Sequence, residues 1–142
     1  MVSKLLMSEI KCILLVDDDQ IANYLHKNFI SKIAVIDNIK TANNGEQALD
    51  ILSNSVNEIK FLPEIIFLDI NMPVCDGFEF MESFNKLDIP EKSKVDIVVV
   101  TSSSNNSDIT RMEDLGIKYY LNKPLNKEKL ADFFHKREEA YI

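Results

Sequence analysis

The sequence lacks any long apolar run, and only two of its 142 residues are cysteines. A membrane-spanning helix needs about 20 consecutive apolar residues, and no stretch approaches that length. Cys12 and Cys75 are too few and too far apart for a disulfide framework, so we expect reduced thiols in a cytoplasmic protein. Residues 1–9 are too short and too mixed for a signal peptide. They are predicted to form an N-terminal extension, and translation starts at Met1 or Met7.

Basic residues are outnumbered as well: 16 Lys and Arg stand against 23 Asp and Glu, which gives a net charge of −7. This balance argues against direct nucleic-acid binding and against an anionic membrane surface. Acidic groups that gather in one cleft attract a cation instead. Repeats and low-complexity tracts are also absent, and the 46% hydrophobic content suits one domain with a proper core.

What the chain does contain is a regular alternation of apolar runs and helical periods. Unbroken apolar runs predict strands buried on both faces of a parallel sheet, and weaker patterns complete a set of five, at 11–16, 37–42, 65–69, 95–100 and 117–121. Helical spacing predicts helices at about 20–32, 46–52, 78–87, 107–115 and 126–139. Ser107 or Asp108 is the expected cap of the fourth helix, and Gly116 its stop. The alternation predicts an α/β fold, a doubly wound five-stranded parallel sheet with helices on both faces.

The first helix is predicted from Ile21, Leu25 and Phe29, apolar residues spaced by four, over about residues 20–32. His26 and His135 fit no motif. We expect both to lie on helix surfaces.

Polar side chains follow four of the predicted strands, where each strand ends: Asp17 and Asp18, Asp69, Thr101, and Lys123. Such ends meet at one edge of a doubly wound sheet, where ligands bind. Carboxylates brought together there repel one another and raise their own pKa values, and a small hard cation such as Mg²⁺ relieves the repulsion. The residues leave simpler readings open. Asp69 could merely cap the following turn, and residues 17–19 could form a solvent-exposed helix N-terminus.

Four segments, in this order and spacing, carry a family resemblance: Leu15-Val16-Asp17-Asp18, Phe67 to Pro73 with Asp76-Gly77, Val100-Thr101-Ser102, and Tyr120 to Pro124. Over about residues 10–138 the chain resembles the receiver domain of bacterial two-component response regulators. The resemblance implies a flavodoxin-like sheet with strand order 2-1-3-4-5, in agreement with the pattern of strands and helices.

The resemblance implies that Asp69 is the phosphoacceptor for a sensor histidine kinase or a histidine phosphotransfer protein. It further implies that Asp18, Asp69 and the backbone carbonyl of Asn71 bind Mg²⁺ directly, with Asp17 acting through water. Lys123 is expected to contact a phosphoryl oxygen.

Thr101 and Tyr120 match the family's switch pair, in which the threonine hydroxyl bonds the phosphoryl group and the aromatic ring turns inward. Ser102 is small, as suits a residue beside an open phosphorylation pocket. The Lys123-Pro124 peptide bond is expected to be cis.

Asn71 and Ser103 occupy the positions that tune access of water to the acyl phosphate in this family. By the resemblance, residues 10–142 form a single receiver domain without an output domain, a signalling unit and not an enzyme beyond its own phosphorylation and dephosphorylation. We expect a monomer or weak dimer that acts on an unidentified protein through the fourth helix, fifth strand and fifth helix, or that relays the phosphoryl group.

Two other classes share parts of this pattern. A haloacid dehalogenase-type phosphatase also uses an aspartate at a strand end with Mg²⁺, but it needs a second acid two residues later, where this chain has Asn71. A flavin-binding module needs a phosphate-cradling loop after the first strand. Three aspartates, residues 17–19, stand there instead.

Overall fold

The fold alternates strands and helices throughout, as the sequence predicts. A computed structural model describes residues 10–55, 62–102 and 105–140. The elements are β1 (Ile10–Val16), α1 (Gln20–Ile33), β2 (Ile36–Ala42), α2 (Gly45–Asn54), β3 (Ile65–Asp69), α3 (Gly77–Lys86), the short 3₁₀ helix η2 (Lys92–Lys94), β4 (Asp96–Thr101), α4 (Asn106–Asp114), β5 (Tyr119–Asn122) and α5 (Lys127–Ala140). Within these ranges no helix is long and apolar enough to cross a membrane.

The five strands form one parallel sheet in the order β2-β1-β3-β4-β5. This confirms the predicted flavodoxin-like arrangement. Its register aligns the strand ends, because Val16 pairs with Leu68 and Thr101 pairs with Asn122. The residues that follow β1, β3, β4 and β5 therefore share one edge of the sheet.

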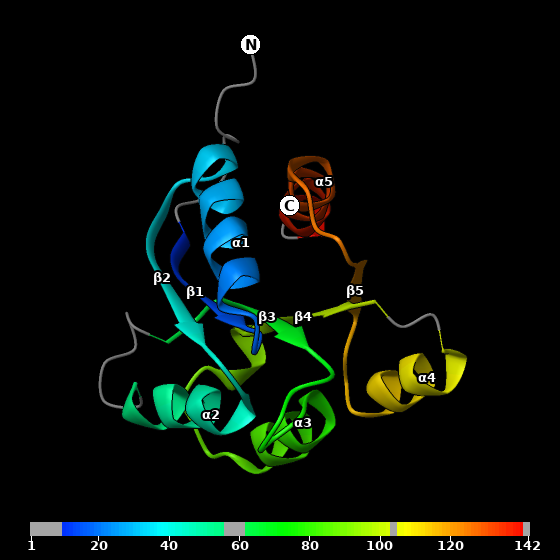
Figure 1. Cartoon of the computed structure of the whole chain (residues 1–142). Coiled ribbons are helices and arrows are strands. Elements are labelled where there is room, and N and C mark those ends of the chain that lie inside the picture. The colour runs from blue at the N-terminus through cyan, green and yellow to red at the C-terminus, as the bar shows by residue number, and fades with distance from the viewer. Residues whose placement is uncertain (1–9, 56–61, 103–104, 141–142) are drawn as a thin grey trace.

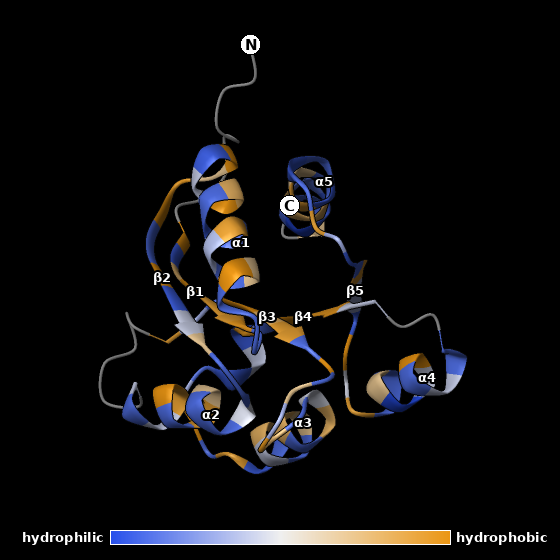
Figure 2. Cartoon of the chain, viewed as in Figure 1, coloured by the Kyte–Doolittle hydropathy of each residue, from blue (hydrophilic) through white to orange (hydrophobic). Residues whose placement is uncertain are grey.

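Helices cover both faces of the sheet (Figure 1). On one face α2, α3 and α4 enclose a core that includes Leu52, Phe80 and Met112, and on the other α1 and α5 enclose a core that includes Ile30 and Phe134. Hydrophobic residues run through the strands, whereas the helices mix both kinds (Figure 2). Every residue of β3 is buried, which explains its unbroken apolar sequence.

The helix α1 lies where its apolar spacing predicts, but those apolar residues are not its buried side. Ile21 and Leu25 are 71% and 44% exposed, and Phe29 is only partly buried. The buried residues of the helix are Asn23, Ile30 and Ile33. Asparagine can be buried here because main-chain carbonyls accept hydrogen bonds from the Asn23 amide nitrogen.

The cap of the fourth helix lies two or three residues earlier than expected. Asn105, and neither Ser107 nor Asp108, caps α4, and its side chain accepts a hydrogen bond from the Ser107 backbone at 2.9 Å. Asparagine is among the strongest N-cap residues, and here it directly precedes the helix. Gly116 follows the helix with φ of 101°, in the left-handed region that glycine tolerates, as predicted for its end.

Candidate functional site

The carboxyl ends of β1 and β3 bring three aspartates together. Asp17 and Asp18 follow β1, Asp69 ends β3, and each offers one carboxylate oxygen within 4.8 Å of the others. Asp17 and Asp69 are 4% and 7% exposed, whereas Asp18 faces solvent. Asp19 is set apart: its carboxylate caps α1 by accepting from the backbone of the helix's first turn.

Lys123 reaches this cluster from the end of β5. Its ammonium lies 2.9 Å from Asp17 Oδ2 and 3.3 Å from Asp69 Oδ2. The backbone N–H of Lys123 donates to Thr101 O at 2.9 Å, and the Lys123-Pro124 bond is cis. Burial lowers the pKa of the lysine, but hydrogen bonding and the charges of Asp17 and Asp69 outweigh it, so the pKa of Lys123 is raised.

Asp69 is held in an unfavourable place for a negative charge. Burial raises the pKa of its carboxyl group, and the charge of Asp17 adds to the effect, while Lys123 partly opposes it. Lys123 therefore does not fully offset the burial of Asp69 and the charge of Asp17. An additional cation beside these oxygens would stabilise the ionised form.

The turn after β3 approaches the end of that strand closely. The N–H of Gly77 donates to Ile70 O at 2.8 Å. A Cβ at Gly77 would lie 2.7 Å from Asp69 O, so the contact requires glycine. Asn71 is exposed in this turn, and Val74 adopts a left-handed backbone with φ of 69°.

The remaining predicted residues lie along the same edge or beside it. Thr101 is buried at the end of β4, and Ser102 is exposed next to it; Ser103 lies outside the described residues. Tyr120 is partly buried on β5, and its hydroxyl donates to Ile109 O of α4 at 3.2 Å. The tyrosine therefore links β5 to α4, and β5 itself pairs with β4, the strand that ends at Thr101.

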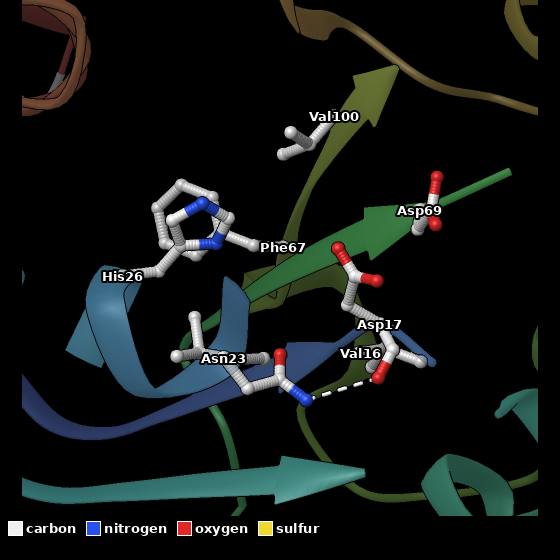
Figure 3. Close-up of a pocket in the computed structure, with 8 residues that line it drawn as sticks. Val16, Asp17, Asn23, His26, Phe67, Asp69 and Val100 are labelled. Carbon is white, nitrogen blue, oxygen red and sulfur yellow. Dashed lines mark hydrogen bonds between the residues drawn. The ribbon is translucent and has the colours of Figure 1, made fainter. Parts of the chain in front are cut away.

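Two residues of α1 near the cluster were not predicted from the sequence. Asn23 and His26 line a cavity of about 10 Å³ behind the carboxylates (Figure 3), together with Leu15, Val16, Asp17, Phe67, Asp69 and Val100. His26 is half-buried, which corrects its expected surface position, and burial lowers its pKa against the charge of Asp17. The spacing Asn23, His26, Ile30 and Ile33 was the available signal, since it forms one helix face.

The donor set fits a hard divalent cation. Carboxylate oxygens are the ligands that Mg²⁺ prefers, and it commonly binds through one or two of them plus water and phosphate. Asp18 is accessible, and the buried oxygens of Asp17 and Asp69 lie within the same 4.8 Å.

A family profile described as the response regulator receiver domain matches residues 13–135, so the chain belongs to this family. This chain is 26% identical over 127 residues to the probable C4-dicarboxylate response regulator DctR of Bacillus subtilis (strain 168), and the match covers 89% of this chain and 52% of that protein. A two-component response regulator from Cytophaga hutchinsonii has a similar structure, with a TM-score of 0.78 and 31% identity over 90% of this chain and 96% of that one. The structure of the phosphorylated cyanobacterial phytochrome response regulator RcpA is also similar, with a TM-score of 0.72 and 27% identity, and 92% of each chain is covered.

Receiver domains are signalling domains that interact with histidine kinases or phosphotransfer proteins and bind Mg²⁺ at an acidic pocket. The family match leaves the haloacid dehalogenase alternative without support. The chain spans about half the length of the first curated relatives it matches, so their whole activity is not carried over to it.

Proposed function

We propose that Asp69 accepts a phosphoryl group from a phosphohistidine on a sensor histidine kinase or a histidine phosphotransfer protein. The observation that carries this proposal is the meeting of three carboxylates within 4.8 Å, with the Lys123 ammonium 3.3 Å from Asp69. The exposed Asp18 lies beside the two buried carboxylates, at the side from which a partner would arrive. The phosphorylated relative RcpA is consistent with this chemistry.

In the proposed transfer, a carboxylate oxygen of Asp69 forms a bond to phosphorus as the phosphorus–nitrogen bond of phosphohistidine breaks. The released imidazole takes up a proton. Phosphoryl transfer passes through a loose transition state, so the protein chiefly positions groups and neutralises charge. We expect the Lys123 ammonium to neutralise a phosphoryl oxygen and the Thr101 hydroxyl to donate a hydrogen bond to the phosphoryl group. Mg²⁺ held by Asp18, Asp69 and the Asn71 carbonyl, with Asp17 through water, would supply the remaining positive charge.

The start of α1 offers a place for the phosphodonor protein. Ile21, Tyr24 and Leu25 are 71%, 65% and 44% exposed, and their spacing puts them on one side of the helix. They follow directly on Asp18 and Asp19. Apolar side chains grouped beside a reactive carboxylate support a protein partner rather than a small substrate.

We further propose that the response leaves through α4, β5 and α5, where the Tyr120 hydroxyl donates to Ile109 O and β5 pairs with β4, the strand that ends at Thr101. Asn71 and Ser103 are proposed to tune hydrolysis of the acyl phosphate.

Residues 10–142 would act as one receiver unit, with 1–9 as an extension. The free thiols of Cys12 and Cys75 support a cytoplasmic location.

Incubation with a small phosphodonor such as acetyl phosphate tests the proposal. A receiver forms one stoichiometric adduct that needs Mg²⁺ and decays slowly. Continuous release of phosphate would indicate a phosphatase, and the absence of any adduct with Mg²⁺ present would reject the phosphoacceptor role.

A further inference from the structure

Asn23 is a buried polar residue whose amide is only half satisfied. It is 4% exposed, and its Nδ2 donates to Asp17 O at 2.9 Å and to Ala42 O at 3.5 Å. Two carbonyl acceptors on this side fix the amide orientation, because the reverse orientation would face oxygen with oxygen. Its Oδ1 accepts no hydrogen bond from any residue that the structure describes. Buried polar atoms of this kind normally have a partner, protein or ordered water.

The unpartnered oxygen points toward the space between His26 and Asp17 (Figure 3). The cavity lined by these residues measures about 10 Å³, which is about the room that one water molecule requires. A water needs two to four polar partners. Besides Asn23, the lining provides the His26 imidazole and the carboxylates of Asp17 and Asp69.

We infer that this cavity binds one ordered water molecule and that Asn23 is a positioning residue for the cation site. The inference rests on the proposed Mg²⁺ site. Asn23 holds the backbone of Asp17 at the end of β1, whose own N–H donates to Ala42 O of β2 at 3.1 Å. The water donates to Asn23 Oδ1 and to the Asp17 carboxylate, with His26 as its third partner. This network keeps the carboxylate at the edge of the sheet, where Asp18 and Asp69 meet it.

Titration calorimetry of Mg²⁺ into the unphosphorylated protein tests the positioning role. Asn23→Leu keeps the approximate size of the side chain but removes both its hydrogen bonds, and we expect Mg²⁺ to bind about 10-fold more weakly. Asn28→Leu is the matched control, since Asn28 lies on the same helix away from the cavity lining. It should bind Mg²⁺ like the wild type. A merely structural role for Asn23 would lower the melting temperature without changing this affinity.

A second pair of variants keeps the inference testable if Asn23→Leu does not fold. His26→Leu removes a polar partner of the water and should weaken Mg²⁺ binding, whereas His26→Gln retains one and should restore much of it. A crystal structure of the wild type should show a water within hydrogen-bonding distance of Asn23 Oδ1. A dry cavity, or equal Mg²⁺ affinities across the variants that fold, would overturn the inference alone. A wild type that binds no Mg²⁺ would overturn the proposed cation site as well.

Discussion

Replacing Lys123 with methionine should lower the stability of the metal-free protein and make that stability depend strongly on Mg²⁺. The ammonium lies within 3.3 Å of both Asp17 and Asp69, which are at most 7% exposed. Methionine has a similar length but carries no charge. The substitution therefore leaves two buried carboxylates facing each other without their cation.

The magnitude follows from how open the site is. Removing one partner of a fully buried ion pair costs about 3–5 kcal/mol. The Lys123 side chain is 26% exposed at the edge of the sheet, so solvent screens part of the interaction. We therefore expect the free energy of unfolding to fall by about 2 kcal/mol in the absence of metal. For 142 residues the unfolding entropy is about 0.3 kcal/mol per kelvin, which converts the loss to a melting point lower by roughly 7 °C.

Thermal melts in EDTA and in millimolar Mg²⁺ measure both parts of this prediction. Mg²⁺ should raise the melting temperature of the wild type by stabilising only the native state. It should raise that of Lys123→Met by more, because the cation then replaces a missing charge. Lys118→Met, at an exposed lysine just before β5, is the control and should melt like the wild type. If Lys123→Met melted within about 1 °C of the wild type in EDTA, the electrostatic account of the cluster would be wrong.

Three further predictions concern the same edge of the sheet. Asp69→Asn should stabilise the metal-free protein in chemical denaturation, because burial and Asp17 disfavour the charge that it removes; a less stable variant would contradict this. Mg²⁺ affinity should fall as the pH drops through the raised pKa of Asp69, and the fall should begin above the ordinary aspartate pKa of about 3.9. Calorimetry at several pH values measures this, and a constant affinity down to the ordinary pKa would contradict it. Gly77→Ala should destabilise by about 1–3 kcal/mol, since its Cβ would meet Asp69 O at 2.7 Å, whereas Glu46→Ala, at an exposed position of α2, should be nearly neutral.

The strand-end residues could be predicted because a parallel sheet has only one carboxyl edge. Uninterrupted apolar runs located β1, β3 and β4, and the crossover rule then placed Asp17, Asp69 and Thr101 together. The distance from Lys123 to the aspartates is a result of the fold that no local pattern encodes.

The first helix shows where sequence reasoning stopped. Its apolar spacing located the helix, but the buried side carries Asn23, whereas Ile21 and Leu25 are exposed. The burial of an asparagine depends on the carbonyls of Asp17 and Ala42, which come from two other elements. Exposed apolar residues at helical spacing mimic a core stripe, and the sequence alone cannot separate the two.

The measurement that tests the central claim most directly is the location of the phosphoryl group after treatment with acetyl phosphate and Mg²⁺. Reduction of the acyl phosphate with borohydride, followed by peptide mass spectrometry, marks the modified aspartate. We predict one modified residue, Asp69, in the wild type and none in Asp69→Asn, which keeps the shape of the side chain but has no carboxylate nucleophile. Modification of a different residue in the wild type, or an equal yield from Asp69→Asn, would contradict the account.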